Sequence, residues 1–271
     1  MMKNILVIRY GTIGDSIFAS AFYRELKCAV KNSKIDILVD KLAEETMQFC
    51  PYIDEIYLIQ GKYKKIFEYL KLFKKYDTVY FLKNDSFFTK VARLANVRNR
   101  IGFDVKRNKF LTVKIPYNED RHEIDCYLDL LKMSGIQVSN FNTEVWLSPI
   151  SINKINNLYD FKSHKNVLVH AYSRFEQKNW LDKYWCEIIQ YLCNEYDAQI
   201  FLCGSSKDTI KYKNILNNLE NINIIDTSGR LSVNESLALV KNMDLVLGID
   251  SGIIHVAAAL DIPSILLHGP T

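Results

Sequence analysis

The sequence of 271 residues contains no apolar run that approaches the ~20 residues needed to cross a bilayer. Its N-terminal segment, residues 1–9, has too short an apolar region for a signal peptide and runs directly into a predicted strand. The net charge is only +4, so the sequence has no overall signature of nucleic-acid binding. We therefore expect a soluble, cytoplasmic protein with no nucleic-acid partner.

Several chemical motifs are also absent. The six cysteines include no C-x-x-C pair, which fits a reducing compartment where cysteines act as small core residues. No D-x-D motif or His/Asp cluster indicates a divalent metal. Neither G-x-G-x-x-G after a predicted strand nor G-x-x-x-x-G-K-[ST] occurs. These absences argue against a dinucleotide oxidoreductase and a P-loop enzyme, and we expect no metal and no cofactor.

What the sequence does contain is an alternation of short β-rich segments with helical patterns, which favours parallel sheets covered by helices. The predicted strands are residues 5–8, 35–39, 55–59, 78–82, 167–169, 199–202, 222–225, 244–248 and 264–267. The clearest predicted helices are residues 121–135, 182–196, 233–241 and 253–260. Residues 148–166 are rich in Asn, Lys and Ser without a strand pattern, so we interpret them as a hinge. The prediction is an α/β protein of two Rossmann-like domains, residues 1–150 and 151–271, facing each other across a cleft.

The end of the chain is unusual for this fold. The last predicted strand runs into Gly269-Pro270-Thr271, and such a strand end usually leads into further structure. We therefore expect the C-terminal part to be truncated, or the protein to be unusually short.

The segment VIRYGTIGDSIFAS, residues 7–20, joins a predicted strand to a predicted helix through Gly11, Thr12 and Gly14. In open α/β sheets, ligands bind at the carboxyl ends of the strands, where Asp15 is expected to lie. Glycine there permits unusual backbone conformations and close approach of another molecule. Aspartate is also a favoured helix N-cap. The segment alone therefore leaves two interpretations of Asp15, a ligand-facing carboxylate and a helix cap.

A second candidate site is Asp250-Ser251-Gly252 with His255. A strand pattern delivers these residues to the start of a helix, where backbone N–H groups form an anion site suited to a diphosphate. His255, one turn into the helix, could donate to the same anion. The alternative is that Asp250 or Ser251 caps the helix and His255 packs inside the protein.

Two further segments carry positive charge. In the loop HAYSRFEQKNW, residues 170–180, Ser173 can donate a hydroxyl hydrogen bond to phosphate and Lys178 supplies a compact charge. The alternative is a solvated loop lysine. The stretch KYKKIFEYLKLFKKY, residues 62–76, places six lysines around an apolar face of Ile66, Leu70 and Phe73. That stretch is either a solvated helix or a basic surface for an anionic acceptor or membrane headgroups.

These motifs together resemble the heptosyltransferase family, inverting glycosyltransferases that extend the inner core of lipopolysaccharide with ADP-heptose. Four segments carry the resemblance in the family's order, and together they span the whole chain. They are ILVIRYGTIGDSIFASAFYRELK, RIGFD followed by HEIDCYLDLLKMSGI, HAYSRFEQKNW, and SGRLSVNESLALVKNMDLVLGIDSGIIHVAAALDIPSILLHGPT. The last segment is the most specific. The sequence departs from the family in ending at Gly-Pro-Thr, where family members continue.

The resemblance implies a GT-B fold, with an N-terminal domain that binds the acceptor and a C-terminal domain that binds the nucleotide sugar. It implies that Asp15 is the catalytic base, beside an acceptor-side loop of Gly11, Thr12 and Gly14. The implied ligands of the nucleotide sugar are Ser173 and Lys178 for the diphosphate, Gly204 and Asp208 near the ribose, the Leu231 backbone for the adenine, and Asp250, Ser251, Gly252 and His255 for the sugar and phosphates.

The expected activity is metal-independent, inverting transfer of a heptose from ADP-heptose to an anionic lipopolysaccharide core acceptor. The expected location is the cytoplasm, with a peripheral contact at the inner face of the inner membrane. The alternatives are a related glycosyltransferase that uses another nucleotide sugar, and a non-catalytic nucleotide-sugar-binding protein. A Rossmann-type oxidoreductase or epimerase is disfavoured by the absent dinucleotide fingerprint.

Overall fold

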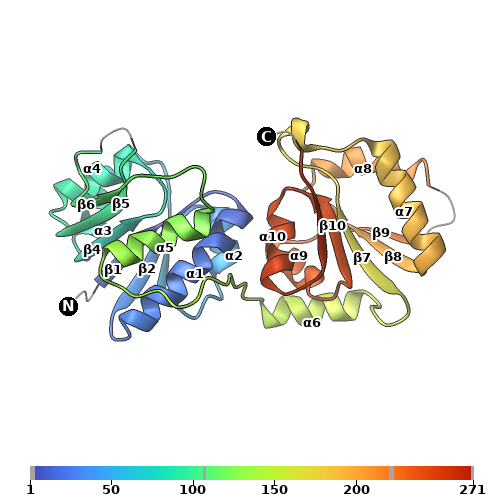
Figure 1. The fold of residues 1–271 in the computed structure, drawn as a ribbon, viewed down its shortest axis with the longest axis horizontal. Coiled ribbons are helices and arrows are strands. Elements are labelled where there is room, and N and C mark those ends of the chain that lie inside the picture. Colours follow the sequence, from blue (N-terminus) through green and yellow to red (C-terminus); the bar gives the residue numbers. More distant parts are fainter. Residues whose placement is uncertain (1–3, 106–107, 220–222, 270–271) are drawn as a thin grey trace. The chain divides into compact units, whose positions relative to one another are not determined.

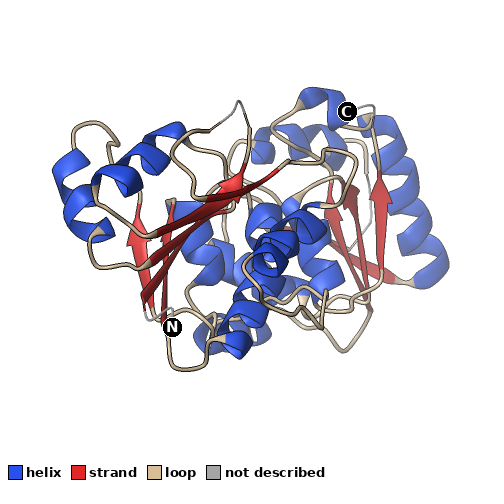
Figure 2. Cartoon of the chain, turned by 60° about the vertical axis from the view of Figure 1, so that its left-hand side comes forward, coloured by secondary structure: helices blue, strands red, loops and turns tan. Residues whose placement is uncertain are grey.

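The computed structural model describes residues 4–105, 108–219 and 223–269, and the chain forms two compact units, Met1–Trp146 and Leu147–Thr271 (Figure 1). Each unit is built on one sheet, and every pair of neighbouring strands in both sheets is parallel. Helices flank the sheets (Figure 2). The predicted parallel α/β architecture is therefore confirmed. None of the described helices is long and apolar enough to span a membrane.

The sheet of the first unit has the strand order β3-β2-β1-β4-β5-β6. Its strands are β1 (Asn4–Ile8), β2 (Lys34–Val39), β3 (Glu55–Leu58), β4 (Thr78–Phe81), β5 (Asn99–Phe103) and β6 (Val113–Ile115). Its helices are α1 (Ile13–Ala29), α2 (Lys41–Met47), α3 (Ile66–Phe73), α4 (Ser86–Leu94) and α5 (Glu123–Met133).

The sheet of the second unit has the order β11-β10-β7-β8-β9. Its strands are β7 (Lys165–His170), β8 (Ala198–Leu202), β9 (Ile224–Asp226), β10 (Leu245–Ile249) and β11 (Ser264–Leu267). Its helices are α6 (Pro149–Leu158), α7 (Asp182–Tyr196), α8 (Asp208–Leu216), α9 (Val233–Val240) and α10 (Gly252–Ala259), with a 3₁₀ turn η1 at Glu176–Lys178.

Helices cover both faces of the first sheet, and β1 shows why. Its side chains alternate between the two faces. Ile5 and Val7 pack in the hydrophobic cluster that contains α1 and α5, whereas Leu6 and Ile8 pack in the cluster that contains α3 and α4. A strand buried on both faces must be apolar throughout, which explains the continuous run of apolar residues in its sequence.

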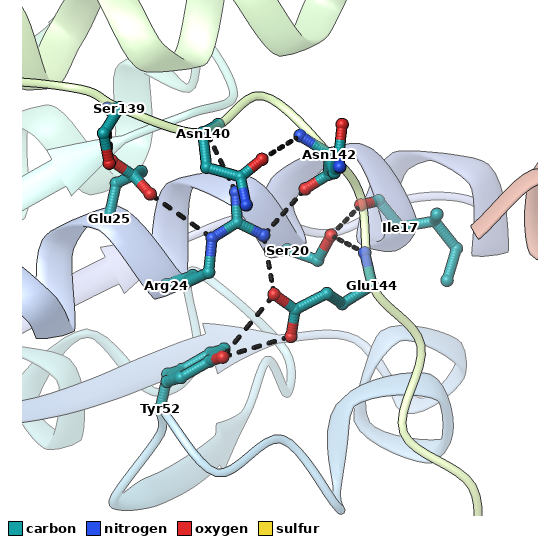
Figure 3. A network of polar contacts seen from close by, with 9 residues as sticks. All are labelled: Ile17, Ser20, Arg24, Glu25, Tyr52, Ser139, Asn140, Asn142 and Glu144. Carbon is teal, nitrogen blue, oxygen red and sulfur yellow. Dashed lines mark hydrogen bonds and ion pairs between the residues drawn. The ribbon is translucent and has the colours of Figure 1, made fainter. Parts of the chain in front are cut away.

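A polar network fixes the last segment of the first unit to α1 (Figure 3). The Arg24 guanidinium, almost fully buried, donates to the Asn142 carbonyl oxygen at 2.7 Å and to the Glu144 carboxylate at 2.6 Å. The Ser139 backbone N–H donates to Glu25 Oε2 at 2.7 Å. Burial raises the pKa of Glu25, but the hydrogen bonds from Ser139 and Arg24 outweigh it, and the net shift of this pKa is downward. The network therefore requires an ionised Glu25.

The structure differs from the sequence-based expectations in two segments of the chain. Strands β5 and β6 were not predicted, although β5 contains the RIGF of the RIGFD motif. The expected hinge, residues 148–166, contains α6, so the expected domain boundary after residue 150 falls inside a helix. Ser148 caps that helix and Pro149 starts it, a pair of signals that the sequence does display. Ile222, Pro270 and Thr271, which belong to expected features, lie outside the described residues.

Candidate active site

Each sheet has one topological switch point, where successive strands are added first on one side of the initial strand and then on the other. Ligands of α/β proteins bind at this point, beyond the carboxyl ends of the strands. In the first sheet this place lies between β1 and β4, and in the second between β7 and β10. The register pairs Ile8 with Phe81 and His170 with Gly248. The residues that follow these pairs therefore emerge together at the binding edges of the two sheets.

Asp15 lies in the first turn of α1, not before the helix. Thr12 is the N-cap, and its Oγ1 accepts from the Asp15 backbone N–H at 3.2 Å. In return, Asp15 Oδ2 accepts from the Thr12 backbone N–H at 2.7 Å, which completes a capping box. The alternative that Asp15 is the N-cap of the helix is therefore wrong: Thr12 is the N-cap, and Asp15 supports the cap from the third helical position. Ile13 and Gly14 are helical, so the expected glycine loop ends at Thr12.

Asp15 also forms an ion pair that the sequence did not reveal. Arg9 Nη2 lies 2.5 Å from Asp15 Oδ1, and the Arg9 side chain is only 6% exposed. Arg9 Nε donates to the Tyr127 hydroxyl at 2.7 Å. Burial opposes the charge of Arg9, but Tyr127 and Asp15 outweigh it and raise the pKa of Arg9. Arg9 therefore remains a cation and fixes Asp15 at the end of β1. The sequence signal for Arg9 was a charged residue directly after the apolar residues 5–8.

Gly11 is required by this arrangement. Its φ of +148° is a conformation that other residues rarely adopt. A Cβ atom at this position would lie 2.3 Å from Asp15 Oδ2 and 3.3 Å from Arg9 Nη1. The glycine thus leaves the space that the carboxylate of Asp15 occupies.

In the second unit, Lys178 and Asp250 meet across the place where the strand order reverses. Lys178 Nζ lies 2.5 Å from Asp250 Oδ2, and His255 Nε2 lies 3.5 Å from Asp250 Oδ1. The hydrogen bond from Lys178 is the main cause that lowers the pKa of Asp250, with burial opposing it and His255 and His268 adding to it. Three residues expected to bind one ligand are therefore together in the folded chain.

The N-terminus of α10 differs from that of α1, because within the described residues no side chain caps it. The Ser251 hydroxyl is buried and, in that part of the chain, has no hydrogen-bond partner. Ser251 is the N-cap residue of α10 by position, but its side chain makes no cap hydrogen bond. The Asp250 carboxylate faces Lys178 and His255 instead. The alternative that His255 packs inside is wrong, because its side chain is partly exposed. The free N–H groups of the first turn, starting at Gly252, carry the positive end of the helix dipole.

Ser173 lies in the loop that also carries Lys178, but its polar groups are engaged within that loop. The Ser173 hydroxyl accepts from the Phe175 N–H at 3.0 Å, and the Ser173 N–H donates to the Asn179 side chain at 2.8 Å. Trp180 anchors the loop, because its ring stacks on Tyr184 with centroids 5.1 Å apart. The structure thus gives Ser173 a structural role within its own turn, in the same loop as Lys178.

Gly204 and Asp208 form one tight turn after β8. Asp208 Oδ2 accepts from the Ser205 N–H at 2.8 Å and from its hydroxyl at 2.7 Å. A Cβ atom on Gly204 would lie 3.0 Å from Asp208, so the turn is tightly packed at this position. Leu231, half-buried, directly precedes Ser232, the N-cap of α9. All of these residues follow the carboxyl ends of parallel strands and so lie at the same edge as Lys178 and Asp250.

No group of three or more His, Cys, Asp or Glu side chains is placed to hold a metal ion in residues 4–105, 108–219 and 223–269. The positive charge at the edge of the second sheet comes from Lys178, from the first turn of α10 and, when protonated, from His255. Such a set attracts an anion such as a diphosphate.

Comparison with known proteins identifies the family. A model of glycosyltransferase family 9 (heptosyltransferase) matches residues 66–271. The chain is 27% identical to lipopolysaccharide heptosyltransferase 1 of Campylobacter coli over 294 residues, covering 99% of this chain and 84% of that protein. It is 24% identical to lipopolysaccharide heptosyltransferase 2 of Salmonella typhimurium over 298 residues, covering 99% and 83%.

Solved structures share the fold. A glycosyl transferase of family 9 from Veillonella parvula superposes with a TM-score of 0.89 at 19% identity, covering 99% of this chain and 82% of that one. E. coli ADP-heptose heptosyltransferase II gives 0.85 at 21% identity, covering 99% and 85%. E. coli heptosyltransferase WaaC, solved with ADP, gives 0.78 at 16% identity, covering 99% and 88%. The predicted GT-B fold is thereby confirmed.

Proposed function

The chain belongs to glycosyltransferase family 9, the heptosyltransferases, and we propose that it transfers a heptose from ADP-heptose to an acceptor in the lipopolysaccharide inner core. Relatives that align with 99% of the chain are named lipopolysaccharide heptosyltransferases, and one structure with this fold holds ADP. The observation that carries the proposal is the uncapped N-terminus of α10 beside the trio of Lys178, Asp250 and His255.

In this proposal the second unit holds the donor. Lys178, His255 and the N–H groups that begin at Gly252 bind the diphosphate, and the orphaned hydroxyl of Ser251 donates to it. The Ser173 hydroxyl, which accepts from the Phe175 N–H, donates its own proton to the diphosphate from the same loop as Lys178. Asp250, whose pKa is low because Lys178 donates to it, accepts hydrogen bonds from sugar hydroxyls. The Gly204–Asp208 turn contacts the ribose, and the Leu231 backbone contacts the adenine.

Asp15 is the base of the proposed reaction. It takes the proton of the acceptor hydroxyl while that oxygen attacks C1 of the heptose, as the bond from C1 to the diphosphate oxygen breaks. A single displacement of this kind inverts the configuration at C1. The leaving ADP carries the negative charge, which Lys178 and the α10 N-terminus stabilise without a metal. A positioned base contributes roughly 10²–10⁴-fold to the rate. Thr12 and Gly11 support Asp15 on the acceptor side.

Calorimetric titration with ADP, ADP-heptose and UDP-sugars tests this donor site. We expect ADP and ADP-heptose to bind, and Lys178→Ala to weaken both by about tenfold or more, since a charge-assisted contact is lost. Lys183→Ala is the matched control, because Lys183 is exposed on α7 a few residues away.

The other outcomes select the alternatives. Preferred binding of a UDP-sugar would indicate a related glycosyltransferase with another donor. ADP-heptose binding without transfer to any core acceptor would indicate a non-catalytic binding protein. Binding that is equal in wild type and Lys178→Ala would contradict the proposed site.

We further propose that the face formed by residues 63, 64, 67, 71 and 74 rests on the inner face of the inner membrane. The helix in the basic stretch is shorter than expected, Ile66–Phe73, and Phe73 is buried in the core as predicted. Tyr63 and Phe67 are 79% and 81% exposed, and the remaining residues of the face are exposed lysines. Exposed aromatic and basic side chains suit an interface with anionic lipid.

Sedimentation with lipid vesicles tests the membrane face. We expect binding to vesicles that contain anionic lipid, and loss of binding in the double variant Phe67→Ser, Lys71→Glu. Equal sedimentation of the variant and the wild type would contradict the proposal.

A further inference from the structure

Lys83 lies at the same edge of the first sheet as Asp15, and the proposed mechanism does not use it. It follows β4 by two residues, beside the place where Arg9 and Tyr10 follow β1. Lys83 Nζ donates to the Tyr10 carbonyl oxygen at 3.2 Å and lies 4.5 Å from the centroid of the Tyr10 ring. The ammonium group is therefore held at the edge of the sheet by a carbonyl and an aromatic ring.

The other cations around Tyr10 have carboxylate partners. Arg9 pairs with Asp15, and Lys62, from the connection between β3 and α3, pairs with Asp85. Lys83 does not: among the described residues, no carboxylate lies within ion-pair distance of it. Its other acidic neighbour, Asp40, caps α2 by accepting from the Ala43 N–H at 3.0 Å.

A half-buried ammonium group without a counter-ion is costly, because burial removes the water that stabilises its charge. Burial is the largest cause that lowers the pKa of Lys83, and Arg9 and Lys62 act in the same direction. Asp15 and Asp40 act in the opposite direction but do not outweigh them. A bound anion would supply the missing counter-charge. It would also gain charge-assisted hydrogen bonds from Lys83.

We propose that Lys83 Nζ binds an anionic group of the acceptor, a carboxylate or a phosphate, and thereby places the acceptor hydroxyl beside Asp15. This inference rests on the proposed function for the identity of the ligand, because the acceptor is the substrate expected at Asp15. It assigns to the first unit a specificity-determining contact that is separate from the diphosphate site of the second unit. Arg9 and Lys62, whose carboxylate partners are already in place, add a positive field without being the primary contact.

Steady-state transfer kinetics with Lys83→Met, Lys83→Arg and Lys90→Met test the inference. Lys90 is the matched control, since it is exposed on α4, seven residues further along the chain. We expect Lys83→Met to raise the acceptor KM about tenfold or more with the donor KM unchanged, as a charge-assisted contact is lost. Lys83→Arg is expected to recover most of the affinity, and Lys90→Met to behave as wild type.

Modified acceptors identify the anion and exclude a merely structural role. The same kinetics are measured with an acceptor whose phosphates have been removed and with one whose carboxylates have been reduced to alcohols. The effect of Lys83→Met should disappear with the acceptor that lacks the recognised anion. An acceptor KM that does not change in Lys83→Met would overturn the inference. An increase in acceptor KM of the same size with the unmodified acceptor and with both modified acceptors would also overturn it.

Calorimetry with acceptor alone separates this inference from the proposed function. Weaker acceptor binding by Lys83→Met than by wild type supports the subsite, even if no heptose is transferred. The absence of transfer would then contradict the proposed function but not the subsite. Equal acceptor binding by both proteins overturns the subsite, whether or not transfer occurs.

Discussion

Asp15 combines a structural and a chemical role in one carboxylate. Its Oδ2 accepts from the Thr12 N–H, and its Oδ1 faces Arg9. Because each carboxylate oxygen has two lone pairs, these contacts leave acceptor capacity for a substrate hydroxyl. The contacts also fix the position of the carboxylate, which is what a general base needs. A capping role for Asp15 therefore does not argue against a role as the base.

Gly11→Ala should disturb this carboxylate specifically. A Cβ atom at Gly11 meets Asp15 Oδ2 at 2.3 Å, whereas one at Gly135 meets nothing within 4 Å, although Gly135 also has a positive φ of +79°. We expect both Gly11→Ala and Gly135→Ala to lose about 1–3 kcal/mol of unfolding free energy from backbone strain, measured by urea denaturation. Only Gly11→Ala should also lose transfer activity. Equal activity of the two variants would show that the Asp15 position is not critical.

The ion pair of Lys178 and Asp250 should be visible in a carboxyl titration. Lys178 lowers the pKa of Asp250. In Lys178→Ala this pKa should rise, as followed by ¹³C NMR of the aspartate carboxyl groups. The lowered pKa means that the pair stabilises the fold above the ordinary aspartate pKa, about 3.9, and that this stabilisation is lost as pH falls through the folded value. An Asp250 pKa that is the same in both proteins would contradict the pairing.

Individual site residues could be predicted from the sequence only in part. Lys178, Asp250 and His255 were predicted because each lies in a motif with its own local pattern, and the fold brings them together. Arg9 was missed although its ion-pair partner Asp15 is near in sequence, because the Tyr127 hydroxyl that holds its side chain is 118 residues away. Lys83 was missed for a similar reason, because its isolation from carboxylates is a property of the folded sheet edge.

At the scale of the element, α1 and α10 show how similar helix starts differ in function. Each follows the carboxyl end of a central strand, β1 or β10. The first turn of α1 is satisfied by a capping box and carries its own carboxylate, Asp15. The first turn of α10 has no side-chain cap among the described residues. We infer that an anionic diphosphate is favoured at α10 and an uncharged acceptor hydroxyl at α1.

The network on α1 predicts a pH-dependent stability. Ser139 and Arg24 hold the pKa of the buried Glu25 below its ordinary value despite the opposing effect of burial. A lowered pKa stabilises the fold above the ordinary glutamate pKa, about 4.3, and this contribution is lost as pH falls through the folded value. We expect Glu25→Gln to lose about 1–3 kcal/mol of unfolding free energy at pH 7. The difference from wild type should shrink as the pH falls below 4 in urea denaturation, and a difference independent of pH would contradict this account.

Most elements could be predicted from the sequence, and the exceptions have physical reasons. The helix 182–196 was predicted to the residue, because its apolar spacing is regular. Strand β6 has only three residues and its sequence, VKI, gives too short a pattern. Helix α6 has a polar sequence with a small apolar side, of which Ile155 is fully buried, so composition suggested a loop. The Ser148-Pro149 start was the stronger signal there.

At the scale of the whole molecule, the two units repeat one topology. The strand orders β3-β2-β1-β4-β5 and β9-β8-β7-β10-β11 are the same pattern, each with its reversal beside the first strand of the unit. The sequence predicted this repetition from the recurring alternation of strands and helices. The account assigns the acceptor and the base to the first unit, and the donor to the second. Substitutions in one unit should therefore change one substrate's binding and leave the other's unchanged.

The most direct test of this division is the transfer rate of Asp15→Asn, measured together with its affinity for ADP. Asparagine keeps an oxygen that accepts from the Thr12 N–H, so the cap is retained while the base is lost. Thr12→Ala is the complementary control, because it removes the Oγ1 cap and keeps the carboxylate. We expect Asp15→Asn to reduce heptose transfer by roughly 10²–10⁴-fold with ADP affinity unchanged, and Thr12→Ala to retain most of the transfer. Transfer by Asp15→Asn at the wild-type rate would show that Asp15 only caps α1, and would contradict the central claim.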